Sequence, residues 1–226
     1  AFGNFEKGRR SQERTFGGFP GGFAMDFYKD LWYNNSACAI PPPGGVYEDK
    51  DPGFPGPEGA PMIKITTDST CDLPARLLEQ YDITVFPLGV VKAGRLYHDG
   101  VDIRTADIAA HVEAGGEITT TNAVNAADYE ETFRTLTGQY DAVLHINIGS
   151  GFSCCCQNAR LAAEEVPEVY VVDSENLTVG HGLLVLAAAE RARAGKSIGE
   201  ILDLLEDMTP RLETSFVLDR LDYMKK

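Results

Sequence analysis

The segment from residue 142 to 158 limits the possible folds of this chain more than any other stretch. Its first part, 142–148, is a mostly apolar run, which is typical of a strand buried on both faces of a parallel sheet. Gly149 and Gly151 end that run, and a segment rich in alanine follows. The pattern therefore predicts a strand, a tight glycine turn and a helix.

The start of that helix is a candidate site for an anion. Backbone N–H groups are unpaired in the first turn of a helix, and the positive end of the helix dipole lies there. Ser150 and Ser153 add hydroxyl donors at this point. The alternative is that one of these serines only caps the helix, since serine is a preferred residue at that position.

Strand and helix patterns alternate from Met62 onward. The predicted strands cover residues 63–67, 83–91, 142–148, 169–173 and 215–218. Four predicted helices begin after Asp72, Thr105, Asn125 and Ser153. A fifth covers residues 179–194, and a sixth begins at the capping box formed by Ser197 and Glu200. This order predicts an α/β fold with a mostly parallel sheet, in which ligands bind beyond the carboxyl ends of the strands.

Three groups of hydroxyl side chains lie where a strand or loop leads into a helix. They are residues 68–70, 119–122 and 150–153, and the candidates to line a shared pocket are Ser69, Asn122, Ser150 and Gly151. The set is rich in donors and poor in charge, so it suits a carboxylate or phosphate oxygen and supplies no evident general base. The alternative is that these are ordinary loop residues, because serine and threonine are common in all loops.

Composition excludes several classes of function. The formal net charge of −14 argues against nucleic-acid binding, which requires clustered Lys and Arg. The longest apolar run, residues 182–189, is far shorter than the roughly 20 residues that span a bilayer. We therefore expect a cytoplasmic protein that is not an integral membrane protein.

The five cysteines do not indicate a metal site or a disulfide framework. Three of them, Cys154, Cys155 and Cys156, are contiguous, and successive side chains on a helix point in different directions. We expect buried small side chains here and no metal. The minor alternative is a reactive thiol near the start of the helix.

Residues 1–61 differ in kind from the remainder of the chain. They contain 8 of the 12 prolines and 11 of the 23 glycines and show no hydrophobic periodicity. Such a composition cannot bury enough apolar surface to offset the entropy of ordering. We expect a disordered or non-native extension, with Met62 as a candidate natural start.

Four motifs in the second part of the chain resemble the DegV family of bacterial fatty-acid-binding proteins. They lie, in the family's order, at residues 65–74, 121–129, 149–159 and 171–174. The resemblance covers residues 62–226 and implies a two-lobed α/β protein, with a first lobe at 62–175 and the start of a second at 176–226. It also implies that an apolar tunnel holds a long-chain fatty acid whose carboxylate is bound by Thr121 and Ser153.

The resemblance implies a carrier rather than a catalyst. Family members present the bound fatty acid to a separate fatty acid kinase, which forms the acyl phosphate, and need no cofactor beyond that ligand. The loop after Thr121 departs from the family's usual threonine-serine-glutamine-proline-serine pattern, and an aromatic residue is missing at Cys156. Family members continue beyond residue 226 into most of the second lobe, which contains a histidine that helps to hold the carboxylate.

The second lobe is therefore expected to be incomplete in this chain. Helices and a strand in 176–226 would lack partners, so their apolar side chains would be exposed and residues 176–226 would pack poorly. The side chains concerned are Leu183, Leu184, Leu186, Ile201, Leu204, Leu205, Phe216 and Leu218.

Two other functions compete with fatty-acid binding. Residues 151–155 approach the G-x-S-x-G elbow of serine hydrolases, with Ser153 as nucleophile, but Cys155 stands where that turn has glycine. His181 is too near Asp173 in the sequence to be a convincing third member of a triad. A redox sensor based on Cys154 to Cys156 is a weaker alternative, and it requires an exposed thiol of low pKa.

Overall fold

The computed structural model describes residues 59–215. The predicted extension at 1–61 and the predicted strand at 215–218 therefore lie almost wholly outside the described residues. Among residues 59–215, none of the helices has both the length and the apolar character needed to cross a bilayer. The elements are β1 (Ile63–Asp68), α2 (Ala75–Gln80), β2 (Thr84–Phe86), β3 (Gly89–Lys92), β4 (Arg95–His98), α3 (Thr105–Glu113), β5 (Thr120–Asn122), α4 (Ala126–Thr137), β6 (Ala142–Asn147), α5 (Cys155–Glu164), β7 (Val169–Asp173), α6 (Thr178–Arg193) and α7 (Ile198–Met208), with short 3-10 turns at Ser69–Cys71 and Thr209–Arg211.

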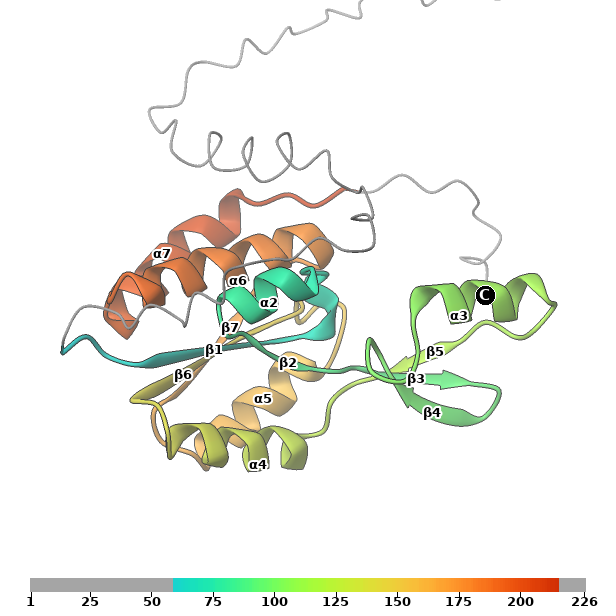
Figure 1. Cartoon of the computed structure of the whole chain (residues 1–226), viewed down its shortest axis with the longest axis horizontal. Coiled ribbons are helices and arrows are strands. Elements are labelled where there is room, and N and C mark those ends of the chain that lie inside the picture. Colours follow the sequence, from blue (N-terminus) through green and yellow to red (C-terminus); the bar gives the residue numbers. More distant parts are fainter. Residues whose placement is uncertain (1–58, 216–226) are drawn as a thin grey trace, which may run out of the picture. The chain divides into compact units, whose positions relative to one another are not determined.

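Four strands form a parallel sheet in the order β2-β1-β6-β7. The predicted α/β fold with a parallel sheet is thereby confirmed. From β1 the chain moves to one side to form β2 and later returns on the other side of β1 to form β6 (Figure 1). The carboxyl ends of β1 and β6 are therefore a topological switch point, the place where open α/β sheets bind ligands.

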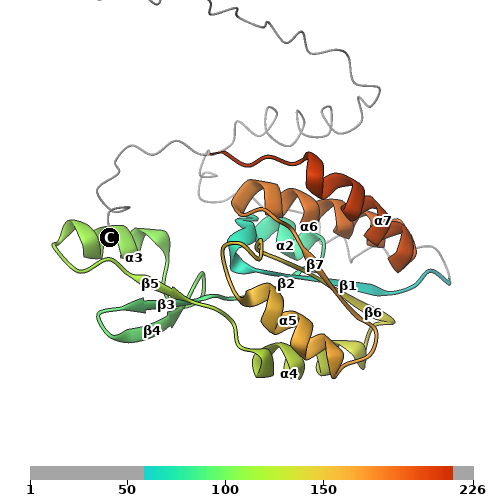
Figure 2. The same ribbon diagram turned by 180° about the vertical axis from the view of Figure 1, so that it is seen from behind.

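Helices cover both faces of this sheet. α2, α6 and α7 lie on one face, and α4 and α5 lie on the other, as the two opposite views show (Figures 1 and 2). β6 is buried along its whole length because it is central in the sheet and covered on both faces. Ile146 belongs to the core beneath α6, and Val143 to the core above α4 and α5.

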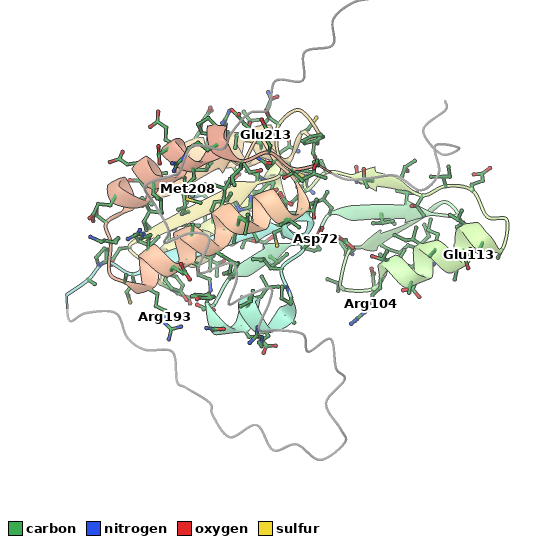
Figure 3. All side chains as sticks on the ribbon, turned by 90° about the horizontal axis from the view of Figure 1, so that it is seen from above. Asp72, Arg104, Glu113, Arg193, Met208 and Glu213 are labelled. Carbon is green, nitrogen blue, oxygen red and sulfur yellow. The ribbon has the colours of Figure 1, made fainter. Side chains whose placement is uncertain are left out.

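The prediction that residues 176–226 pack poorly is wrong for the described part of that segment. Leu184, Leu186, Ile201 and Leu205 are buried, and Leu183 and Leu204 are half-buried. α6 and α7 lie side by side over the sheet (Figure 3, where Arg193 and Met208 mark their C-terminal ends). They complete the core that contains β1 and β6. Phe216 and Leu218 lie outside the described residues.

The predicted single strand at 83–91 is two strands in two sheets. β2 ends at Phe86, and the chain then crosses to β3, which pairs antiparallel with β4 and β5. β4 is missed by the sequence pattern. The turn before it uses Ala93 and Gly94, both with positive φ, which suits the right-handed twist of a hairpin.

Local capping signals identify the starts of α4 and α7. Asn125 caps α4 by accepting a hydrogen bond from the Asp128 N–H at 2.9 Å. The predicted capping box at the start of α7 is present, since Ser197 and Glu200 each accept from the other's backbone N–H. Asp72 does not cap α2, because it adopts a left-handed conformation and the helix begins after Pro74.

Two buried histidines make the stability of this fold sensitive to mild acid. His145 lies among the rings of Phe86, Tyr129 and Phe133, and burial lowers its pKa to about 3. Burial also lowers the pKa of His181. The unfolded state therefore binds more protons than the folded state just below the ordinary histidine pKa, so stability falls as pH falls.

Between pH 6.5 and 5.5 we expect the free energy of unfolding to decrease, by about 1 kcal/mol through His145 and by a further amount through His181. Urea denaturation at the two pH values measures the decrease. In His145→Gln the decrease should be smaller by about 1 kcal/mol. A stability that does not change over this interval contradicts the prediction.

Candidate functional site

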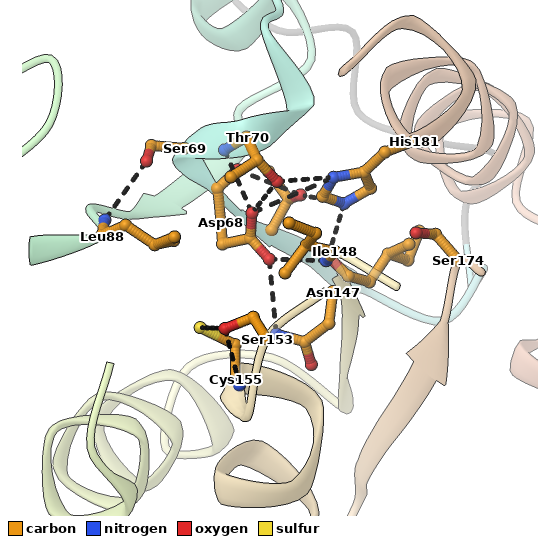
Figure 4. A network of polar contacts seen from close by, with 12 residues as sticks. Asp68, Ser69, Thr70, Leu88, Asn147, Ile148, Ser153, Cys155, Ser174 and His181 are labelled. Atoms are coloured by element: carbon orange, nitrogen blue, oxygen red, sulfur yellow. Dashed lines mark hydrogen bonds and ion pairs between the residues drawn. The ribbon is translucent and has the colours of Figure 1, made fainter. Parts of the chain in front are cut away.

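Asp68 is the central residue at the switch point. It ends β1, and its side chain is fully buried. One carboxylate oxygen accepts hydrogen bonds from the N–H of Thr70, at 3.0 Å, and from its hydroxyl. The other accepts from the N–H of Ile148 at 2.7 Å and from the side-chain amide of Asn147 at 3.5 Å (Figure 4). Asp68 thus joins the ends of β1 and β6.

Asn147 extends this network to the face covered by α4 and α5. Its amide nitrogen also donates to the Tyr129 hydroxyl at 3.1 Å. Its amide oxygen is buried and points away from Asp68, without a hydrogen-bond partner in the described part of the chain (Figure 4). Burial raises the pKa of Tyr129, so the phenol stays protonated.

His181 extends the network on the opposite face. It projects from α6, is fully buried, and has its Nε2 3.0 Å from the carbonyl oxygen of Ile146 and 2.9 Å from the Thr67 hydroxyl. Its Nδ1 lies 3.3 Å from the Thr70 hydroxyl. Because the Ile146 carbonyl can only accept, Nε2 carries the proton that this contact requires. His181 therefore joins α6 to the ends of β1 and β6.

Ser153 lies just before α5 and is half-buried. Its Oγ accepts from the N–H of Cys155 at 3.2 Å and lies 3.2 Å from the Cys155 sulfur, to which it donates (Figure 4). The Ser153 hydroxyl thus accepts from the first N–H of α5, whereas the residue at the N-cap position is Cys154, which makes no capping hydrogen bond with its side chain. In the contact with the Cys155 N–H the Ser153 hydroxyl is the acceptor, so its own proton is donated to the Cys155 thiol, which is a weak acceptor. A carboxylate is a stronger acceptor for this proton than a thiol.

The turn that carries Ser153 is held by the loop after β7. Asp173 Oδ1 accepts from the N–H of Ser150 at 3.0 Å and from the N–H of Glu175 at 2.9 Å. The N–H of Gly149 donates to the carbonyl of Asn176 at 2.7 Å. We call these three hydrogen bonds the 149–176 clasp. Gly149 is required here, because a Cβ atom would lie 2.9 Å from the backbone carbon of Glu175.

Gly151 and Ser150 have less restricted surroundings. A Cβ atom on Gly151 would meet nothing within 4 Å, and both residues are exposed. Desolvation opposes ionisation of Asp173, but hydrogen bonds from Ser150 and Glu175 outweigh it and lower the pKa of that carboxyl. The clasp therefore contains a carboxylate at neutral pH.

Thr121 lies in the smaller sheet. It is an exposed residue of β5 and pairs with Val90 of β3. Thr121 and Ser153 therefore belong to different sheets, because β5 is not in the sheet that contains β6, the strand before Ser153. A hydrogen bond nevertheless joins the segment after β5 to α5, since Asn158 donates to the carbonyl of Val124 at 2.7 Å.

Ser69 joins the two sheets. Its Oγ accepts from the N–H of Leu88 at 3.2 Å, and Leu88 lies between β2 and β3 (Figure 4). Asn122, at the end of β5, is exposed and pairs with Gly89. Of these two sequence candidates, Ser69 is half-buried and its hydroxyl already accepts a backbone hydrogen bond, whereas the side chain of Asn122 is accessible to solvent.

A shallow cavity lies next to Ser153. Its volume is about 440 Å³, within the range of about 300 to 1,000 Å³ for ligand pockets, and its lining includes Phe152, Asn176, Leu177, Leu212 and Thr214. A second cavity, of about 410 Å³, lies beside α6 and the segment 212–215. Neither Thr121 nor Ser153 lines either of these two cavities.

The geometry does not favour the hydrolase alternative. Among residues 59–215, the hydrogen-bond partners of the Ser153 hydroxyl are both atoms of Cys155. His181 and His145 are engaged elsewhere, by Thr67 and Thr66 respectively. A serine nucleophile requires a base within hydrogen-bond reach, and no histidine contacts Ser153 in this part of the chain.

The cysteines fit a packing role in two of three cases. Cys155 and Cys156 are buried, as expected, whereas Cys154 is exposed. Burial raises the pKa of Cys156, which is opposite to the requirement for a reactive thiol. Within the described ranges, no three His, Cys, Asp or Glu side chains are placed to hold a metal ion.

The sequence patterns place Asp68 in one of the three polar groups but do not identify Asn147, His181 and Asp173 as parts of this site. Asp68, Asn147 and Asp173 have one common signal, which is that each is the last residue of its strand. A polar residue at the carboxyl end of a parallel strand lies at the ligand-binding edge of the sheet, so this rule identifies Asn147 and Asp173 as well as Asp68. Nothing local indicates that His181 contacts β1.

Comparison with known proteins places this chain in a family. Residues 62–226 match the family model described as an uncharacterised protein of the DegV family. A DegV domain-containing protein from Deinococcus radiodurans is 37% identical over 164 residues, which are 72% of this chain and 58% of the relative. A second, from Caldanaerobacter subterraneus, is also 37% identical over 164 residues, with the same two coverages.

Solved structures give the same result. A Thermus thermophilus DegV family protein, described by its fatty acid binding, is 34% identical with a TM-score of 0.64, over 66% of this chain and 54% of that one. Bacillus subtilis DegV, described as a fatty acid binding protein, is 29% identical with a TM-score of 0.63, over 67% and 55%. The chain thus spans a little over half the length of these proteins. The fold, the four motifs and the family match lead to one conclusion: this chain belongs to the DegV family.

Proposed function

We propose that this chain binds a long-chain fatty acid, with the hydroxyls of Thr121 and Ser153 donating to its carboxylate. The observation that carries the proposal is the position of Ser153, which is half-buried at the start of α5, just beyond β6 at the switch point. Two further observations support it: solved relatives are described as fatty acid binding, and the Val124–Asn158 hydrogen bond links the segment after Thr121 to the helix after Ser153.

The proposal includes the use of the bound ligand. We infer that the protein acts as a carrier in the cytoplasm and presents the fatty acid to a fatty acid kinase, which forms the acyl phosphate. In support of a carrier, the exposed donors near the switch point are neutral and no base contacts Ser153 within residues 59–215. A kinase assay on fatty acid supplied with and without this protein tests the partnership.

Ser153→Ala tests carboxylate binding. We expect the affinity for a long-chain fatty acid to fall about tenfold to a hundredfold, because a hydrogen bond to a charged group contributes about 1.5 to 3 kcal/mol. Titration calorimetry measures the change. Ser153→Thr keeps the hydroxyl and should retain most of the affinity. An unchanged affinity in Ser153→Ala would leave Ser153 with the role of a helix cap alone.

Thr121 is tested in the same assay with a neighbour as control. Thr121→Val keeps the shape and β propensity of the side chain but removes its hydroxyl. Thr120→Val makes the same change on the opposite face of β5, because successive side chains of a strand alternate. We expect weaker binding only from Thr121→Val.

A further inference from the structure

We propose that Asp173 is a positioning residue for the carboxylate site: it fixes the turn 149–153 so that the Ser153 hydroxyl is presented to the ligand. This inference rests on the proposed function, since it concerns how the same site is held. It goes beyond that function by assigning a role to a side chain that contacts the backbone of the turn.

The hydrogen bonds of Asp173 support this role. A single oxygen, Oδ1, accepts from Ser150 in the turn and from Glu175 in its own loop, at 3.0 and 2.9 Å. The carboxylate therefore bridges the segments that follow β6 and β7. Neither contact lies within a helix or strand ladder, so no regular structure would replace it if Asp173 were removed.

The turn 149–153 is packed against its neighbours at its first residue and is exposed to solvent at the next two. Gly149 is buried and lies against the backbone of residues 175 and 176. Ser150 and Gly151 are exposed, and the N–H of Phe152 returns to the carbonyl of Gly149 at 2.9 Å. The bond from Ser150 to Asp173 is thus the side-chain contact that restrains the exposed half of the turn before Ser153.

The loop after β7 is itself well fixed, which allows Asp173 to act as an anchor. Ser174 and Asn176 are buried and form three hydrogen bonds with one another. Thr214 donates to the Asn176 side chain at 2.8 Å. Glu175 has a positive φ of 51°, a conformation that is uncommon outside glycine and that its neighbours must maintain.

Two variants separate the hydrogen bonds from the charge. Asp173→Ala removes the acceptor for both N–H groups, whereas Asp173→Asn keeps an oxygen at that place and removes the negative charge. Equilibrium dialysis with radiolabelled hexadecanoate and hexadecan-1-ol measures binding of ligands that share a chain and differ in the head group.

If Asp173 positions the carboxylate site, Asp173→Ala should weaken hexadecanoate binding about tenfold and change hexadecan-1-ol binding less than about twofold. Asp173→Asn should restore hexadecanoate binding to about the wild-type value. A general loss of structure would weaken the binding of both ligands to the same extent, and that result would overturn the inference. An unchanged preference of Asp173→Ala for hexadecanoate over hexadecan-1-ol would overturn it as well.

Amide hydrogen exchange supplies a measurement that does not depend on ligand. Although Ser150 is exposed, its N–H should exchange slowly in the wild type and in Asp173→Asn, because the side chain at position 173 accepts its hydrogen bond in both. In Asp173→Ala the same N–H should exchange quickly. Fast exchange of that N–H in the wild type would also overturn the inference. If the wild type binds hexadecanoate and Ser153→Ala weakens binding, but Asp173→Ala does not, the proposed function stands and only the role of Asp173 is lost.

Discussion

Asp68→Asn is expected to lower the free energy of unfolding by about 3 to 5 kcal/mol, although the side chain keeps its shape. The carboxylate accepts donors on both oxygens, from Thr70 on one and from Ile148 and Asn147 on the other. Asparagine offers one oxygen, so donors on the other side would face an amide N–H₂ group. Two buried hydrogen bonds to a charged group, at about 1.5 to 3 kcal/mol each, account for this loss.

Asp72→Asn is the matched control. Asp72 is exposed and has a φ of 49°, a conformation that asparagine adopts readily. Its replacement should change stability by less than about 0.5 kcal/mol. Urea denaturation of both variants gives the comparison, and equal midpoints would contradict the assigned role of Asp68.

Gly149→Ala should destabilise the protein by about 2 to 3 kcal/mol, because the added methyl group would overlap a backbone. The Cβ would lie 2.9 Å from the carbonyl carbon of Glu175 and 3.0 Å from the nitrogen of Asn176. Backbone atoms cannot move aside as a flexible side chain can, and the adjoining loop is fixed by buried hydrogen bonds. Thermal unfolding followed by circular dichroism measures the effect.

Gly151→Ala, two residues further along the same turn, provides the control. No atom lies within 4 Å of the position of its Cβ. It should leave stability within about 0.5 kcal/mol of the wild type. Should the two variants unfold at the same temperature, the close approach of residues 149 and 175–176 would not be a feature of the folded protein.

The sequence predicts those elements whose signals are local. β6 is recognisable because the mostly apolar segment 142–148 suits a central parallel strand. α4 and α7 are recognisable because Asn125 and Ser197 mark their starts. The break between β2 and β3 could not be read in this way. β2 and β3 are separated by Pro87 and Leu88 alone, and their pairing partners lie in different sheets.

The packing of α6 was also beyond local reasoning. Its buried residues occur nearly all around the helix, including Gly180, His181 and Gly182 near its start. A Cβ on Gly182 would lie 2.5 Å from the carbonyl oxygen of Cys71, so this glycine lets α6 approach the turn after β1. The leucines of α6 and α7 were expected to need a second lobe because the sequence does not reveal this contact.

For the site, the sequence indicates which edge of the sheet is involved, but it does not indicate the hydrogen bonds that join neighbouring segments at that edge. Asp68, Asp173 and His181 act on segments that lie elsewhere in the chain or on the backbone of another loop. Such contacts depend on which strands become neighbours, and this is known only once the strand order is known. Ser153 was found because its motif is contiguous.

The pairing of β1 with β6 has a consequence for how the chain reaches its folded state. Thr66 and His145 are partners 79 residues apart, and the smaller sheet is formed entirely from residues between them. Closing so long a loop is slow, and pairing between distant strands is a main determinant of folding rate. During synthesis, the edge of β1 that pairs with β6 stays open until β6 has left the ribosome, whereas β2 and the β3–β4 hairpin emerge earlier. Partly folded chains with an unpaired strand edge are prone to aggregation, so we expect this interval to be the most vulnerable one in the folding of the chain.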